Sequence, residues 1–114
     1  MDNAKELYIL WTNADELTSQ MMVMMYARNA MLHHWWDSVT VIIWGATAKL
    51  VAENKIIQEE MLLAKQAGVH FSACIACAIN LGVRENLESL GVEVIPWGQG
   101  LTQLIQDKCN LITI

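Results

Sequence analysis

Five short apolar runs of strand length alternate with helical segments along the 114 residues, and this alternation limits the fold more than any other feature. The runs cover residues 6–11, 38–45, 69–73, 92–96 and 110–114. The second run, SVTVIIWG, is mostly apolar and β-branched, which is typical of a strand buried on both faces. Strands that alternate with helices form βαβ units. The sequence therefore predicts an α/β protein with a mostly parallel five-stranded sheet and helices on both faces.

Helical periodicity fills the segments between the runs. The predicted helices cover residues 15–33, 46–54, 55–67, 76–81, 83–90 and 102–107, and the WGQG stretch at 97–100 is predicted to be a loop. Asn13 is placed to cap the first helix, with Glu16 three residues later as in a capping box.

The first helix carries two apolar stripes when its residues are placed at 100° intervals. The predicted core stripe contains Leu17, Met21, Met24, Met25, Met31 and Leu32. Met22, Tyr26 and Ala30 lie roughly opposite, and we expect this second stripe to contact another subunit, because methionine adapts well to contact surfaces.

Composition excludes several functions. Apolar residues make up 54% of the chain and nothing resembles a linker, so residues 1–114 are predicted to form a single domain. No apolar run reaches the roughly 18–20 residues of a membrane span, and no signal segment opens the sequence. The net charge of −5 without a basic stripe argues against nucleic acid. Three cysteines do not form a disulfide framework. We therefore expect a cytoplasmic protein with reduced thiols that binds neither nucleic acid nor membranes.

Ligands of parallel sheets gather beyond the carboxyl ends of the strands. Cys74 directly follows the third predicted strand, with Cys77 three residues on. The other candidate binding residues at these strand ends are Asn13, Trp44, Gly45, Trp97 and Gly98. The strand ends thus predict a site centred on Cys74.

The cysteine pair leaves several interpretations open. Two packed, inert thiols would suit the neighbouring alanines. A zinc site needs four ligands, and no second C-x-x-C pair is present, so no metal is expected. A redox dithiol has the right spacing and would form a reversible disulfide. A nucleophilic Cys74 near the first turn of a helix would be favoured as a thiolate, and Cys77 would lie one turn away.

The CIACAINLGV stretch, residues 74–83, and the order of elements across nearly the whole chain resemble the DsrE/DsrF-like proteins, which include TusD-type sulfur-relay subunits and YchN-like proteins. In the sulfurtransferase members a cysteine after a strand is followed by a small-residue helical run and then a glycine. Cys74 and Gly82 match that pattern, eight residues apart. The IIWG strand end at 42–45 and the tail from residue 90 also resemble small single-domain members. The arginines of TusD-type members are replaced here by Asn80 and Leu81.

This resemblance implies a three-layer α/β/α fold, assembly into homo-oligomers (trimers or hexamers), and an active cysteine at Cys74. The sequence therefore predicts a sulfur-relay protein that accepts sulfane sulfur as a persulfide on Cys74, with Cys77 assisting and with a sulfur donor or acceptor protein as partner. No cofactor is expected, because thiolate exchange supplies the chemistry. The alternative is a non-catalytic oligomeric module that binds a small ligand or a partner peptide in a pocket lined by Trp44, Trp97 and the loop glycines.

Overall fold

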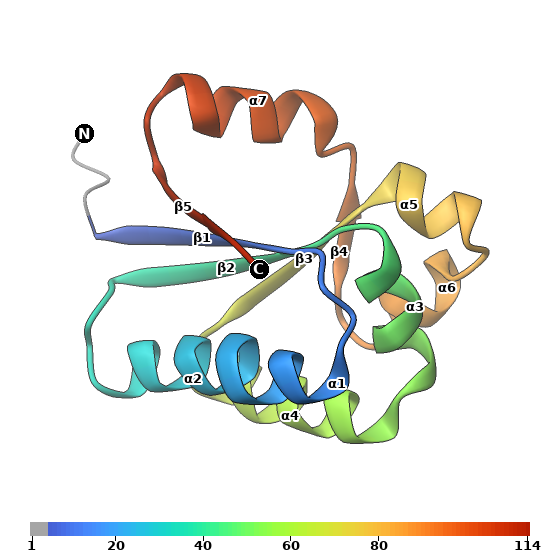
Figure 1. Ribbon diagram of the computed structural model, residues 1–114, viewed down its shortest axis with the longest axis horizontal. Coiled ribbons are helices and arrows are strands. Elements are labelled where there is room, and N and C mark those ends of the chain that lie inside the picture. The colour runs from blue at the N-terminus through green and yellow to red at the C-terminus, as the bar shows by residue number, and fades with distance from the viewer. Residues whose placement is uncertain (1–4) are drawn as a thin grey trace.

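The computed structural model describes residues 5–114, which form one five-stranded parallel sheet with helices on both sides (Figure 1). The strands are β1 (Glu6–Trp11), β2 (Ser38–Ile43), β3 (His70–Cys74), β4 (Glu93–Ile95) and β5 (Asn110–Thr113). Their order in the sheet is β4-β3-β2-β1-β5, and every neighbouring pair is parallel. The predicted α/β class and three-layer fold are confirmed.

The helices divide unequally between the two faces of the sheet. They are α1 (Glu16–Thr18), a π-helical segment η1 (Ser19–Met24), α2 (Met25–Leu32), α3 (Ala46–Glu53), α4 (Lys55–Gln66), α5 (Ile75–Asn80), α6 (Arg84–Ser89) and α7 (Gly98–Gln106). In Figure 1, α1, α2 and α4 lie below the sheet and α7 lies above it, while α3, α5 and α6 lie together at the right of the view. No helix within residues 5–114 combines the length and apolar character needed to cross a membrane.

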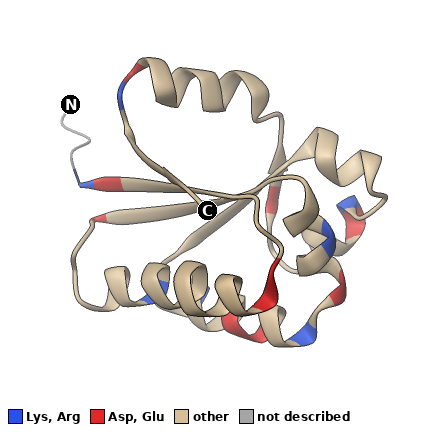
Figure 2. Ribbon diagram, viewed as in Figure 1, with Lys and Arg blue, Asp and Glu red and all other residues tan. Residues whose placement is uncertain are grey.

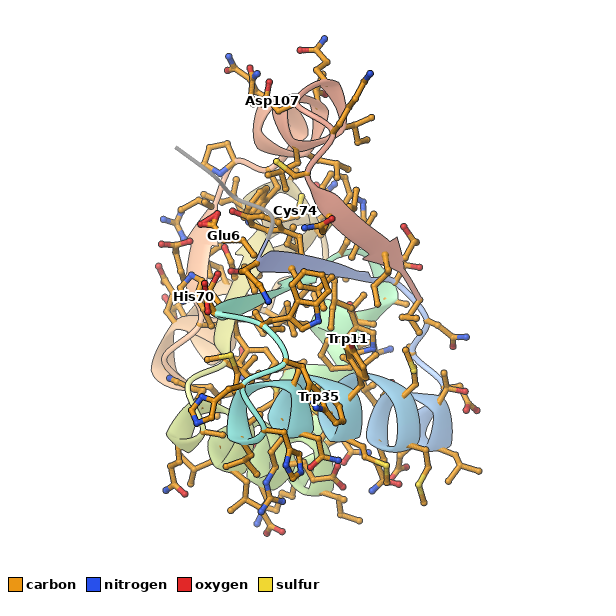
Figure 3. The ribbon with its side chains drawn as sticks, turned by 90° about the vertical axis from the view of Figure 1, so that its left-hand side faces the viewer. Glu6, Trp11, Trp35, His70, Cys74 and Asp107 are labelled. Carbon is orange, nitrogen blue, oxygen red and sulfur yellow. The ribbon has the colours of Figure 1, made fainter. Side chains whose placement is uncertain are left out.

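Two separate apolar clusters follow from this arrangement. Alternate residues of a strand point to opposite faces, so Leu7, Ile9 and Trp11 of β1 enter the larger cluster, on the side of α2 and α4. The smaller cluster lies on the α7 side and is built around Ile42, Cys74 and Trp97. Figure 3 shows the same division, with Cys74 above the sheet and Trp11 and Trp35 below it. The candidate site therefore belongs to the smaller cluster.

The predicted orientation of the first helix is wrong. The side chains that face the sheet are small or polar, among them Ser19, Val23, Ala27 and Ala30, all fully buried. By contrast, most of the predicted core stripe is exposed to solvent: Leu17, Met21, Met25 and Leu32. Two physical causes explain this result. The π-helical turns of η1 take up extra residues, so spacing at 100° per residue loses phase, and a helix that approaches a sheet closely needs small side chains at the contact.

The cap of the first helix is also not the predicted one. Asp15 is the N-cap, and its side chain accepts a hydrogen bond from the backbone N–H of Thr18 at 2.9 Å. This bond lowers the pKa of the Asp15 carboxyl, because the charged form accepts it better. Asn13 acts one step earlier, where its Oδ1 accepts a hydrogen bond from the backbone N–H of Asp15 at 2.9 Å. The Asn13 side chain therefore forms an Asx turn, and the Asp15 side chain caps the helix that follows.

Candidate functional site

Cys74 is the last residue of β3 and the N-cap of α5. The strand was predicted to end at residue 73, so β3 extends one residue further than expected. His70, Ser72 and Cys74 alternate along β3, so all three side chains point to the α7 face of the sheet. Cys77 follows within the first turn of α5 and packs against the cluster that contains Cys74. The chain thus brings the two thiols together through a strand end and one helical turn.

The two thiols differ in exposure. Cys74 is only 5% exposed and packs with Ile42 and Trp97. Cys77 is half-buried and lies at the surface side of the pair. Both side chains are thiols and not a disulfide. A reagent from solvent therefore meets Cys77 more readily than Cys74.

A hydrogen bond links the thiols and affects the ionisation of Cys77. Burial raises the pKa of Cys77, and the hydrogen bond with Cys74 raises it further. A backbone hydrogen bond from Gly45 acts in the opposite direction and lowers the pKa of Cys77. The net effect raises the pKa of Cys77 above its ordinary value.

Trp97 covers this face of β3 and is held by a chain of hydrogen bonds. Its indole Nε1–H donates to Ser72 Oγ at 2.7 Å, and Ser72 Oγ donates to Glu93 Oε1 at 2.9 Å. Glu93 also lies 3.4 Å from Nε2 of His70 at the surface. The indole is almost completely buried. Since a buried N–H needs an acceptor, Ser72 fixes where the Trp97 ring lies.

Glycine at position 100 makes room for the same ring. A Cβ at Gly100 would lie 2.9 Å from Cε3 of Trp97, closer than such atoms approach. A Cβ at Gly98, by contrast, would meet nothing within 4 Å. The WGQG stretch, predicted to be a loop, is in fact the start of α7. Its glycines lowered the predicted helical tendency, and the one at Gly100 is required by packing instead.

The structure brings four of the five predicted binding residues to the cysteine pair or its immediate neighbours. Trp44 packs against the small cluster, Gly45 contacts Cys77 through its backbone, and Trp97 with Gly98 closes the α7 side. Asn13 follows β1, which is separated from β3 by β2. The Asn13 backbone carbonyl accepts hydrogen bonds from Trp11 Nε1 and Ser19 Oγ, at 3.1 and 3.2 Å, so its contacts serve the start of the first helix.

The sequence interpretation missed Ser72 and Glu93. Ser72 could have been identified from the sequence, because alternate residues of a strand share one face and Ser72 is two residues before Cys74. Glu93 could not be identified, since its register opposite Ser72 depends on the pairing of β3 with β4. Neither α5 nor α7 carries a charged residue, which leaves the neighbourhood of the thiols uncharged on those helices (Figure 2). Within residues 5–114, no group of three or more His, Cys, Asp or Glu side chains could hold a metal.

Comparison with known proteins identifies the fold and then the family. No family model and no curated protein sequence matches the chain. The YchN protein from E. coli is similar in structure, with a TM-score of 0.69 and 14% identity over 96% of this chain and 99% of that one. The MTH1491 protein of unknown function from Methanobacterium thermoautotrophicum gives a TM-score of 0.67 and 18% identity over 96% and 97% of the two chains. The fold is therefore DsrE/YchN-like, and the predicted resemblance is confirmed.

A nearer relative comes from Bacteroides thetaiotaomicron. The conserved protein of unknown function BT1422 is 35% identical to this chain, with a TM-score of 0.94. The match covers 96% of this chain and 95% of that one. The chain belongs to the family of BT1422, and its fold is that of the YchN protein.

Proposed function

We propose that this protein is a sulfur carrier that accepts sulfane sulfur as a persulfide on Cys74 and passes it to a second protein or thiol. One observation carries the proposal: Cys74 ends β3 at the carboxyl edge of the parallel sheet and begins α5, with Cys77 packed against the same cluster in the first turn. Ligands of parallel sheets gather at this edge, and a second thiol one helical turn away can take part in thiol exchange.

The chemistry needs only thiol exchange. The Cys74 thiolate attacks the terminal sulfur of a donor persulfide, and a new S–S bond forms on Cys74. The S–S bond of the donor breaks, and the donor leaves as a thiolate. Transfer to an acceptor repeats the same exchange in the other direction. In the reducing cytoplasm the resting pair stays as two thiols.

The buried position of Cys74 limits which molecules can reach it. Trp97 closes one side of the cluster, and Cys77 stands on the accessible side. Because Cys74 is only 5% exposed, small sulfane-sulfur species should reach it more readily than the persulfide of a protein donor. The uncharged surfaces of α5 and α7 favour a partner without a strongly charged contact region.

We also infer that further copies of the chain pack on the outer face of the first helix and α4. Leu17, Met21, Met25, Leu62 and Leu63 are each between 43% and 61% exposed on this face. A cluster of large exposed apolar side chains marks a contact surface. Its charges include both signs, with Arg28 and Glu60 lining one groove together with Met21 and Leu63. A self-complementary contact between identical chains suits such a mixture.

A second candidate function is favoured by the burial of Cys74 and by the two tryptophans. In this alternative the protein is a non-catalytic binding module, and Trp44 and Trp97 with the loop glycines hold a small ligand or a partner peptide. The cysteines are then packed side chains, as buried thiols commonly are. Cys74→Ser separates the two functions, because a carrier loses its activity and a binding module keeps it.

Intact mass after exposure to an inorganic polysulfide tests the carrier function. We expect wild type and Cys109→Ser to gain one sulfur, about 32 Da, and Cys74→Ser to gain none. Cys109 is a matched control, because it is the third thiol of the chain and lies outside the site, just before β5. Equal uptake by Cys74→Ser and wild type would contradict the proposal, and no uptake by any form would favour the binding module.

A further inference from the structure

We propose that Cys77 is a resolving thiol, which attacks the persulfide on Cys74, releases hydrogen sulfide and closes a Cys74–Cys77 disulfide. This inference rests on the carrier function and adds an activity to it. The protein would then deliver sulfur in two forms: as a persulfide when an acceptor is present, and as sulfide when none is.

The backbone already suits such a bond. Cys74 and Cys77 are three residues apart across the first turn of α5, and residues at this spacing lie on the same side of a helix. Cys74 is the N-cap, with extended backbone angles of φ −67° and ψ 118°, so its side chain is not fixed in the helical direction. A disulfide needs Cα atoms about 4.4–6.8 Å apart, and adjacent positions of one turn satisfy that range. Cys77 also packs against the apolar cluster that contains Cys74, so the two side chains share one environment.

The step balances without an external oxidant. The sulfur of Cys77 attacks the inner sulfur of Cys74–S–SH, a Cys74–Cys77 S–S bond forms, and the bond to the terminal sulfur breaks. The terminal sulfur takes the electron pair of the broken bond and the proton of Cys77, and it leaves as hydrogen sulfide. Two cysteine sulfurs are oxidised and one sulfane sulfur is reduced. A small dithiol then returns the disulfide to two thiols.

The surroundings favour the internal reaction over attack from solvent. Trp97 and Ile42 pack around Cys74 and leave it 5% exposed, so external thiols have poor access to its inner sulfur. Cys77 lies beside that sulfur in the same turn, and an internal nucleophile held in place reacts as if highly concentrated. Burial raises the pKa of Cys77, so its nucleophilic thiolate is a smaller fraction at neutral pH than at higher pH. Release should accelerate as the pH rises toward that raised value.

The test compares two proteins that both carry Cys109→Ser. One keeps Cys74 and Cys77 and is called wild type below, because its site is unchanged. The other also carries Cys77→Ser. The proteins are loaded with inorganic polysulfide, desalted to remove the excess and incubated without added thiol. Intact mass and trapped sulfide are followed over time. We expect wild type to lose the added sulfur, to end about 2 Da below its starting mass because two hydrogens leave on disulfide formation, and to release one sulfide per chain. Cys77→Ser should hold its added sulfur about tenfold longer or more.

The outcomes separate this inference from the carrier function. If both proteins gain sulfur and lose it at the same rate, or if wild type never falls below its starting mass, Cys77 is not a resolving thiol and the carrier function stands. If neither protein gains sulfur, the carrier function fails and the inference fails with it. A rate of sulfide release that rises with pH in wild type and not in Cys77→Ser would support the assignment of Cys77 as the attacking group.

Discussion

Burial raises the pKa of Cys77 because it disfavours the thiolate, and the neighbouring Cys74 raises it further. The pKa of Cys77 is therefore raised in the folded protein, and the fold favours the protonated thiol. This contribution to stability is fully present below the ordinary cysteine pKa and is lost as the pH rises through the raised value. We expect Cys77 to be alkylated more slowly at neutral pH than cysteine in a short peptide, with a rate that continues to rise at higher pH.

Peptide mass spectrometry after timed alkylation measures this rate, since fragmentation separates adducts on Cys77 from those on Cys74. Cys74→Ala provides the control. It removes the neighbouring thiol and leaves part of the burial, so the pKa of Cys77 should fall part of the way toward its ordinary range. Alkylation of Cys77 at neutral pH that is faster than in the peptide would contradict the account.

Ser72 is predicted to hold Trp97 over Cys74. Ser72→Ala leaves the buried indole N–H without its acceptor, which costs about 1–3 kcal/mol of unfolding free energy. We also expect alkylation of Cys74 to become several-fold faster, because the freed ring covers it less well. Urea unfolding and timed alkylation measure the two effects. The matched control is Ser89→Ala, whose hydroxyl donates to Asn86 O on the exposed surface of α6, and both quantities should stay near wild type.

At the scale of single elements, α7 depends on one glycine and not on the other. Gly100→Ala brings a Cβ to 2.9 Å from Cε3 of Trp97, so overpacking should cost about 1–3 kcal/mol of unfolding free energy. Gly98→Ala meets nothing within 4 Å and should be neutral or stabilising by up to about 1 kcal/mol, because alanine favours a helix. Urea unfolding measures the unfolding free energy of both variants. Equal changes for Gly100→Ala and Gly98→Ala would contradict the prediction and would mean that the Trp97 ring moves aside freely.

An element could be predicted from the sequence when its cause lies in neighbouring residues, and not when it depends on contacts formed in the folded chain. β1 was predicted with the bounds that it has, because it is a short, nearly continuous apolar run followed by the mostly polar residues 12–16. The end of β3 was displaced by one residue, since Cys74 serves both the strand and the cap of α5. The face of the first helix was wrong because η1 changes the residues per turn. The start of α7 was missed because the close contact of Gly100 with Trp97 exists only in the folded chain.

The same distinction applies to the candidate site. The position of Cys74 and its approach to Trp44, Gly45 and Trp97 followed from strand ends in a parallel sheet, which sequence order largely determines. The raised pKa of Cys77 and the Trp97–Ser72–Glu93 chain depend on side-chain packing and strand register. Those features could not be obtained from residue types alone.

At the scale of the whole molecule, the apolar face of the first helix and α4 is predicted to join identical chains. Met21→Glu together with Leu63→Glu places two charges in the groove that these residues line, so assembly should weaken at least tenfold in dissociation constant, about 1.4 kcal/mol. Sedimentation over a range of concentrations measures this change. Ile105→Glu is the control, since Ile105 is equally exposed but belongs to α7 on the other side of the sheet. A wild-type protein that stays monomeric at all concentrations would contradict the inference.

The central claim is that Cys74 carries sulfur, and two proteins that retain a single cysteine test it most directly. One combines Cys77→Ser with Cys109→Ser and keeps Cys74, and the other combines Cys74→Ser with Cys109→Ser and keeps Cys77. Both are exposed to inorganic polysulfide and weighed intact. The account predicts a gain of one sulfur, about 32 Da, only in the protein that keeps Cys74. A gain only in the protein that keeps Cys77 would contradict it and would assign the sulfur to the more exposed thiol.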